Sequence, residues 1–384
     1  MWIKNVKIKL ENDFVIKNIQ ILNGHIASIT SNLLESKQET IYDGKGYVLL
    51  PSFLDMHCHL RDPGFTDKED LLTGQKSALK GGFTTVCPMA NTNPIVDNEV
   101  VIKDILNRSK KMNLCEVMQI GAVTKDFKDE FVDYKEMKKH TFLFSNDGKP
   151  IVKDEIMKQA LINSEKYDFL LMVHEEPEAE MIERDLFLQR KYGGNLHICH
   201  VSLEDSIKLI RKHKEKGNKV SAEVTAHHIY RSNMDYRVHP PFRKESDRNA
   251  LIEGIERGDI DCLGTDHAPH TPKDKINGSP GLISFEFAFG MVQKVFQDSG
   301  LPLSKFIEIT SYNPSIKLRK EPVKIEIGAR ANLVLVDLEN DYKVSLENLE
   351  TKSSNYPFKD DKLRGKVIMT IREGEVKYVD RSFI

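Results

Sequence analysis

The chain has 384 residues, of which 40% are hydrophobic and 30% are charged, so it can bury a large core and is not compositionally disordered. The 56 Lys and Arg residues nearly balance the 58 Asp and Glu residues, which argues against a general affinity for nucleic acid or an anionic membrane. The N-terminus has no apolar signal core, and no run approaches the roughly 18 apolar residues of a membrane span. We therefore expect a cytoplasmic protein whose partners are determined by local chemistry.

Short strands of alternating hydrophobicity are predicted at both ends of the chain. They are expected at 3–10, 14–22, 25–29, 331–337, 366–371 and 376–379. Asn23-Gly24 is a strong hairpin turn signal between two of them. The similar ends predict one small β-rich domain, with residues 1–50 as its N-terminal part and 319–384 as its C-terminal part. The polar stretch 352–362 is typical of a loop.

Between these ends, short apolar runs alternate with charged stretches of helical period, which is the pattern of repeated βα units. Eight runs occur, at 53–59, 84–89, 115–122, 141–147, 169–174, 195–200, 219–226 and 260–266. Eight parallel strands predict an α/β fold, a closed (β/α)8 TIM barrel over residues 51–318. The clearest helices are 153–166 and 202–216, with Ser202 as the expected cap of the second and Gly217 just after its end.

Metal-ligand side chains stand where the predicted strands end, which is where barrel enzymes place their active sites. Strands one, four, five, six and eight supply them: His57, His59, Asp147, His174, His200 and Asp266. Alternate strand residues share a side, so His57 and His59 should face the barrel mouth together while Cys58 faces away. Imidazoles and carboxylates on one rim suit zinc or a similar divalent ion.

Two further groups of candidate ligands are less favoured. His227-His228 ends the seventh strand and competes with His200 for a ligand position; we favour His200 and treat His227 as a supporting or structural residue. The cysteines lie in apolar runs without CxxC spacing, so we expect buried thiols. They are Cys58, Cys87, Cys115, Cys199 and Cys262.

The segment DMHCHLRDPG at 55–64 resembles the signature of class I dihydroorotases within the amidohydrolase superfamily. Further segments agree: MANTNP at 89–94, FSNDG at 144–148, HICHVS at 197–202, EVTAHH at 223–228, PPFR at 240–243 and TDHAPH at 265–270. The likeness continues into the tail, with NYPF at 355–358. It implies metal-dependent, reversible hydrolysis of the cyclic amide of dihydroorotate to N-carbamoyl-aspartate in pyrimidine (UMP) synthesis.

The resemblance also implies roles for individual residues. The six strand-end residues would hold one or two Zn2+ ions per subunit, with Asp147 where many relatives carry a carboxylated lysine. Asp266 would act as base and then as acid. The substrate-binding residues implied are Arg61, Asn91, His239, His270 and Gly278. By itself, Arg61 could equally form a surface ion pair with Asp62 or Asp67, and the segment around Gly278 could be a simple turn.

Four positions depart from the family pattern: Ala90, Asn146, Ala226 and His239. The first three replace a proline, an aspartate and a proline, and His239 replaces an asparagine that contacts substrate in the family. The stretch 228–238 is also shorter than the family's mobile loop. These departures concern substrate handling more than the metal ligands.

Two alternative functions follow from the same residues. A hydantoinase or allantoinase would share the metal chemistry but lack a carboxylate grip such as Arg61, Asn91 and His270. A catalytically silent dihydroorotase-like subunit would only scaffold aspartate transcarbamoylase, and such homologues typically lose metal ligands, which this chain retains. The resemblance is compatible with a homodimer and with association with aspartate transcarbamoylase.

Overall fold

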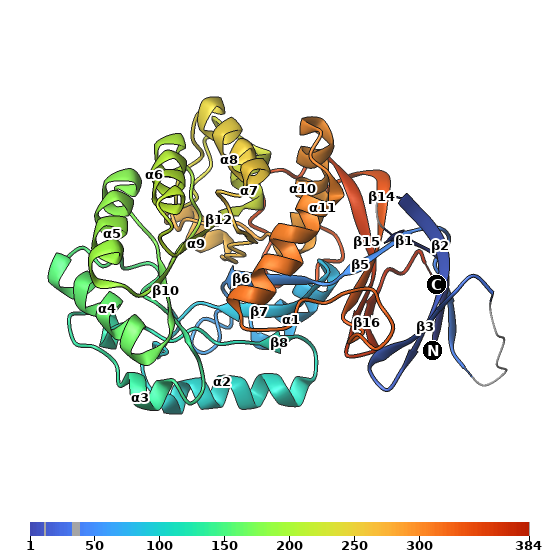
Figure 1. The fold of residues 1–384 in the computed structure, drawn as a ribbon, viewed down its shortest axis with the longest axis horizontal. Coiled ribbons are helices and arrows are strands. Elements are labelled where there is room, and N and C mark those ends of the chain that lie inside the picture. Colours follow the sequence, from blue (N-terminus) through green and yellow to red (C-terminus); the bar gives the residue numbers. More distant parts are fainter. Residues whose placement is uncertain (11–12, 33–38, 384) are drawn as a thin grey trace.

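The computed structural model describes residues 1–10, 13–32 and 39–383, which form a barrel ringed by helices and a β-rich part that contains both ends of the chain (Figure 1). One sheet, ordered β16-β15-β14-β5-β1-β2-β3 with β4 paired to β1, makes up this β-rich part. Its strands are β1 (Trp2–Leu10), β2 (Asp13–Leu22), β3 (His25–Thr30), β4 (Ile41–Asp43), β5 (Val48–Pro51), β14 (Leu333–Lys343), β15 (Lys362–Arg372) and β16 (Glu375–Val379).

The two chain ends join where β5 pairs antiparallel with β14, with Leu50 opposite Val334. Side chains such as Ile3, Ile19 and Leu333 are fully buried between the strands and their neighbours. The predicted β-rich part built from both termini is thus confirmed. The division of the chain at residues 50 and 318 stays a prediction.

The eight predicted barrel strands are all present and parallel. They are β6 (Phe53–Cys58), β7 (Phe83–Pro88), β8 (Glu116–Val117), β9 (Leu143–Ser145), β10 (Leu170–Val173), β11 (Asn195–Ile198), β12 (Val220–Thr225) and β13 (Cys262–Gly264). Single bridges close the ring, one between Gly121 and Phe144 and one between Cys58 and His267. The α/β barrel prediction is therefore confirmed.

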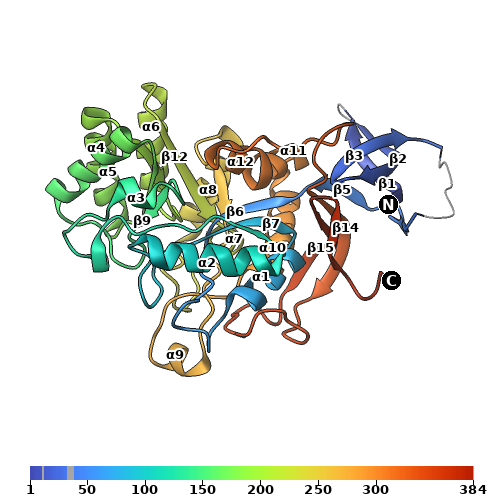
Figure 2. The ribbon, with the colours of Figure 1, turned by 90° about the horizontal axis from the view of Figure 1, so that it is seen from below.

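Helices surround the barrel, as Figures 1 and 2 show from two directions. They are α1 (Leu71–Lys80), α2 (Glu99–Met112), α3 (Tyr134–Met137), α4 (Asp154–Tyr167), α5 (Glu178–Tyr192), α6 (Glu204–Glu215), α7 (Ala226–Tyr230), α8 (Glu245–Arg257), α9 (Pro272–Ile276), α10 (Phe285–Ser299), α11 (Leu303–Ile307) and α12 (Asn313–Lys317), with a 3-10 turn at Lys125–Phe127 and a π turn at Glu308–Tyr312. In Figure 2, α9 projects away from the body of the barrel. None of the described helices is long and apolar enough to span a bilayer.

The predicted helices 153–166 and 202–216 correspond to α4 and α6, but the cap of α6 was predicted wrongly. Its N-cap residue is Leu203, which offers no side-chain acceptor. Ser202 instead donates its hydroxyl to Glu178, and the carboxylate of Asp247 accepts from the backbone N–H of Glu204 at 3.0 Å. A carboxylate from another helix thus replaces the local cap.

The stretch 352–362 is more than the polar loop that its composition indicates. Tyr356 and Phe358 are buried in the main core, and Asn355 is 9% exposed. Five cysteines are buried and free among the described residues, as expected.

An aromatic cluster joins the barrel to the helices that close it. The ring of Phe53 on β6 lies 5.6 Å from Phe83, 5.7 Å from Phe289 on α10 and 5.3 Å from Phe306 on α11, measured between centroids. Phe53 is 1% exposed. This cluster fixes the first strand, which carries the HxH pair, against the last helices.

Replacing Phe53 with alanine should lower the free energy of unfolding by about 3–5 kcal/mol, because the lost ring leaves a cavity among three others. Phe187→Ala is the matched control: Phe187 is 62% exposed, so its loss should cost less than about 0.5 kcal/mol. Urea denaturation followed by circular dichroism measures both values. If both variants lost the same free energy of unfolding, the aromatic cluster would not stabilise the fold as described.

Candidate metal and active site

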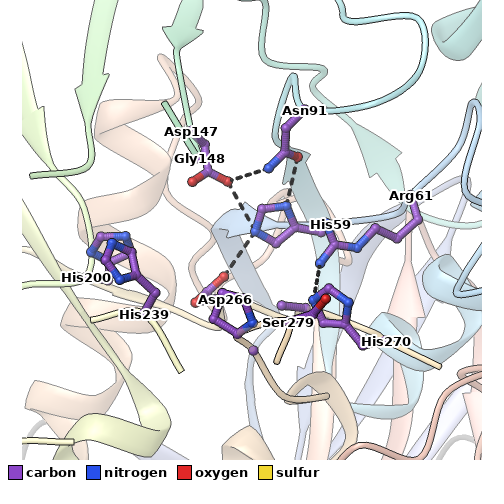
Figure 3. Close-up of a pocket in the computed structure, with 13 residues that line it drawn as sticks. His59, Arg61, Asn91, Asp147, Gly148, His200, His239, Asp266, His270 and Ser279 are labelled. Carbon is purple, nitrogen blue, oxygen red and sulfur yellow. Dashed lines mark hydrogen bonds and ion pairs between the residues drawn. The ribbon is translucent and has the colours of Figure 1, made fainter. Parts of the chain in front are cut away.

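A cavity of about 190 Å³ opens at the carboxyl ends of the barrel strands (Figure 3). Its lining residues are His59, Arg61, Asn91, Asp147, Gly148, His200, His239, Asp266, Ala268, His270, Ser279, Pro280 and Gly281. Eight of the residues predicted from the sequence are therefore brought together here. His57 and His174 adjoin this cavity, with ring centroids 5.3 and 4.9 Å from that of His200.

The two histidines of the first strand meet two carboxylates. His59 Nε2 lies 3.1 Å from Asp266 Oδ1 and 3.3 Å from Asp147 Oδ2. His57 Nε2 lies 3.5 Å from Asp266 Oδ1, and His174 Nε2 lies 3.6 Å from Asp147 Oδ1. Ligand atoms around a tetrahedral zinc ion, bonded at about 2.0–2.1 Å, are roughly 3.3 Å apart, so each of these pairs could ligate a common cation.

Unpartnered nitrogens show that the cluster suits a metal. Nε2 of His57 and Nε2 of His174 are buried and have no hydrogen-bond partner among the described residues. Their Nδ1 atoms are occupied: Glu223 Oε1 lies 2.6 Å from that of His57, and Ser145 Oγ lies 3.1 Å from that of His174. Each ring is thus oriented with one nitrogen left for a ligand.

The electrostatics of the cluster also favour a positive charge. Although burial alone would lower it, Glu223 and Asp266 raise the pKa of His57 to about 10. Burial keeps the pKa of His174 and of His200 well below the usual value, so these rings stay neutral. Burial raises the pKa of Asp266 to about 6. A cation at this position would satisfy both the carboxylates and the unpartnered nitrogens.

Glu223 contacts His57, although no role was predicted for this glutamate from the sequence. It lies on β12, is fully buried, and also contacts His197 Nε2 at 3.1 Å. Although burial raises its pKa, His57 and His197 hold the pKa of the Glu223 carboxyl well below its usual range. The sequence signal that could have identified Glu223 is its acidic side chain inside the predicted barrel strand 219–226.

Cys199 lies close enough to His57 and His174 to complete an alternative ligand group. Burial raises the pKa of this thiol well above its usual value, which favours its protonated form in the protein alone. The carboxylate Asp147 is the better third ligand. The ligand atoms of Asp147, His57 and His59 all lie within 4.8 Å of one another.

The backbone at the site takes an uncommon conformation at three positions. His200, Asp266 and Arg61 have φ values of 36°, 41° and 58°. Non-glycine residues rarely adopt positive φ, and such residues cluster at functional sites. At each of these three positions the positive φ changes the direction of the backbone just after a barrel strand.

Arg61 points into the cavity and does not form the surface ion pair that was the alternative. Its Nη2 donates to His270 Nε2 at 3.2 Å, and its Nε donates to Pro269 O at 3.2 Å. Asp62 pairs with Arg108 at 2.8 Å instead. Burial, aided by Arg61, lowers the pKa of His270 to about 3, so its ring accepts from Arg61 as a neutral imidazole.

Asn91 joins a histidine to a carboxylate of the His and Asp cluster. Its Oδ1 lies 3.1 Å from His59 Nδ1, and its Nδ2 donates to Asp147 Oδ2 at 3.0 Å. The neighbouring departure, Asn146, has a structural role: its Oδ1 accepts from Val123 N at 2.9 Å, which ties strand β9 to the preceding loop. Asp147, not Asn146, therefore lines the cavity.

His227 and Gly278 lie outside the lining. His227 is buried against His228 and Phe242, with ring centroids 4.4 and 5.9 Å away. Gly278 is close to Arg237, and it is the following residues, from Ser279 to Gly281, that line the cavity. The structure thus brings His200, rather than His227, to the cluster.

Two supporting residues hold the strand ends in register. Asp55 accepts from Thr265 N at 2.9 Å and from Thr265 Oγ1 at 2.7 Å, which joins strand one to the end of strand eight. Asn355 accepts from His270 N at 3.0 Å and donates to Gly281 O at 3.1 Å. The sequence indicated neither contact, because both join segments far apart in the chain.

The amidohydrolase family matches residues 48–377. The chain is 36% identical over 399 residues to a dihydroorotase of Clostridium botulinum, covering 98% of this chain and 99% of that protein. It is 36% identical over 409 residues to a dihydroorotase of Aquifex aeolicus, covering 97% and 96%.

Among solved structures, L-hydantoinase (dihydropyrimidinase) from Arthrobacter aurescens superposes with a TM-score of 0.86 at 21% identity, covering 98% of this chain and 95% of that one. At this identity the match shows a shared fold alone. The amidohydrolases are metal-dependent hydrolases, which agrees with the buried His and Asp cluster. The chain therefore belongs to the amidohydrolase family and, within it, to the dihydroorotases.

Proposed function

We propose that this chain is a dihydroorotase that opens and closes the cyclic amide of dihydroorotate at the barrel mouth. The observation that carries the proposal is the Arg61–His270 pair, which lies beside the His and Asp cluster in the same cavity. To hydrolyse a cyclic amide that bears a carboxylate, an enzyme needs a metal site for the amide and a cationic side chain for the carboxylate. Relatives called dihydroorotases, at 36% identity over nearly the whole chain, support this assignment.

In this proposal His57, His59, Asp147, His174, His200 and Asp266 hold the metal. Zn2+ is the proposed ion, at one or two per subunit, because four imidazoles and two carboxylates suit it. When bound, such an ion polarises the amide carbonyl and lowers the pKa of water towards neutrality. Asn91 and Glu223 orient the imidazoles of His59 and His57.

Asp266 moves the proton. Its carboxylate would accept the proton of the attacking water as the new C–O bond forms at the ring carbonyl. The protonated carboxyl would then deliver that proton to the ring nitrogen as the C–N bond breaks, so one residue serves as base and acid. In the protein alone, burial raises the pKa of Asp266 to about 6, so this carboxyl holds a proton more readily than an exposed one does.

Arg61 and His270 would bind the substrate carboxylate. The buried guanidinium offers planar donors that match a carboxylate, and its hydrogen bonds to Pro269 and His270 hold it in place. Asn91 and His239 line the same cavity and complete the proposed contacts. In the loop after α9, Ser279 is better placed for a contact than Gly278.

The remaining parts of the proposal concern the setting of the enzyme. The cytoplasm is its proposed location. A homodimer and an association with aspartate transcarbamoylase are compatible with the function, and every residue used above comes from one chain.

Arg61→Ala should lower kcat/KM for dihydroorotate by at least about a hundredfold, because the substrate carboxylate loses its charged partner. Hydantoin has no carboxylate, so any hydrolysis of hydantoin should fall far less. Ultraviolet absorbance follows dihydroorotate hydrolysis, the reverse cyclisation of carbamoyl-aspartate and hydantoin hydrolysis alike. A wild-type enzyme that hydrolyses hydantoin but not dihydroorotate would overturn the proposed function in favour of a hydantoinase.

Asp266→Asn should reduce kcat by about a hundred- to ten-thousandfold, since an amide cannot take and return the proton. Metal content, measured by mass spectrometry, separates this effect from loss of a ligand. Asp235→Asn, an exposed carboxyl on the nearby loop, is the control and should keep wild-type kcat. Retention of kcat by metal-loaded Asp266→Asn would rule out the proton-transfer role.

Glu223→Gln should weaken zinc affinity about 10- to 100-fold, because the His57 ring loses the carboxylate that orients it. Glu69→Gln is a matched control, since Glu69 is equally buried and lies 3.4 Å from the imidazole of His267, outside the cluster. Competition with a chromophoric chelator measures affinity, and added Zn2+ should restore activity to the stripped wild type. Equal affinities in both variants would contradict the role of Glu223.

A further inference from the structure

Two loops face each other across the cavity. Loop 7, residues 231–244, connects α7 to α8 without a helix or strand of its own. Loop 8, residues 277–282, follows α9. Loop 7 supplies His239 to the cavity lining, and loop 8 supplies Ser279, Pro280 and Gly281. Figure 3 places His239 and Ser279 on different sides of Asp266.

Lys275 connects the two loops. This half-buried residue of α9 donates from its ammonium group to three backbone carbonyls, those of Arg237, Ser279 and Gly281, each at 2.9 Å. An ammonium group has three donors, so the three carbonyls use its full capacity. One acceptor lies in loop 7, two residues before His239, and the other two flank Pro280 in loop 8.

Additional contacts make this connection specific. The Lys275 ammonium lies 4.3 Å from the centroid of the Tyr236 ring, within the range of a cation–π interaction. The backbone N–H of Gly281 donates to the same Arg237 carbonyl at 3.0 Å. Burial, with the nearby Arg237, lowers the pKa of Lys275 to about 8, in keeping with an ammonium group withdrawn from water.

Although α9 projects from the barrel, its start and loop 8 are held by contacts with neighbouring segments. Thr271 and Asp274 cap α9 reciprocally, and Lys68 pairs with Asp274 at 3.2 Å. At Gly281 a β-carbon would lie 2.6 Å from the Ala268 side chain, so loop 8 packs closely on strand eight's extension. Arg237, whose carbonyl Lys275 holds, is itself an exposed residue of loop 7.

We propose that Lys275 is a positioning residue that fastens loop 7 to loop 8 and thereby holds His239 and Ser279 around the substrate. The proposal rests on the proposed function for its substrate, dihydroorotate, but the connection itself is independent of the reaction. The contacts give loop 7 a fixed position beside loop 8.

Lys275→Met tests the kinetic consequence, because it removes the donors while keeping most of the stem. KM for dihydroorotate should rise about tenfold with kcat within about threefold of wild type, since the fastened loops contribute equally to binding of substrate and transition state. Lys273→Met is the matched control, because this exposed lysine of α9 is not among the residues that line the active-site cavity. Metal content should be the same in all three proteins.

Trypsin gives a readout that does not depend on activity. The carbonyl held by Lys275 belongs to the Arg237–Val238 peptide bond, and trypsin cleaves a bond faster when its segment opens more often from the folded protein. Cleavage there, followed by mass spectrometry without substrate, should be about tenfold faster in Lys275→Met than in wild type or Lys273→Met.

The outcomes separate the two proposals. If Lys275→Met leaves cleavage at Arg237 unchanged, or speeds it without raising KM, the positioning role is wrong. If wild type fails to hydrolyse dihydroorotate while the cleavage rates still differ as expected, the loop connection stands and the proposed function falls.

Discussion

Two buried carboxylates, Asp147 and Asp266, lie 3.1 to 3.6 Å from the imidazole nitrogens of three histidines, and both are at most 8% exposed. Burying two negative charges together is costly unless a cation compensates them. In the protein alone, part of that compensation comes from His57. Although burial alone would lower it, Glu223 and Asp266 raise the pKa of this imidazole to about 10. A divalent ion would supply the compensation more fully, and the rest of the site is organised to keep these groups in place.

The support for this cluster comes from residues that never touch the cavity. Glu223 orients His57, Ser145 orients His174, and Asp55 holds the first strand to the extension of the last. Asn355, from the segment that leads into β15, fixes the backbone of His270. The β-rich part is therefore connected to the active site in two places: through the segment before β15, and through the first barrel strand, β6.

Substrate handling depends on loops more than on the barrel. The departures from the family pattern have different consequences: Asn146 joins β9 to a neighbouring loop, and Ala226 begins α7, where the proline of the family would fit equally well. His239 is the departure that reaches the cavity. Its position follows from loop 7, whose tip Lys275 holds against loop 8.

The sequence by itself determined the barrel, the paired β-rich ends and most of the His and Asp cluster. Hydrophobic period and HxH spacing are local properties, and they fix the side of a strand or helix that a residue faces. It did not reveal that Glu223 meets His57, that Lys275 meets Arg237, or that Ser279 rather than Gly278 lines the cavity. Those contacts join residues far apart in the chain or depend on loop backbone. Only the closure of the barrel, which brings distant strand ends and their loops to one rim, decided them.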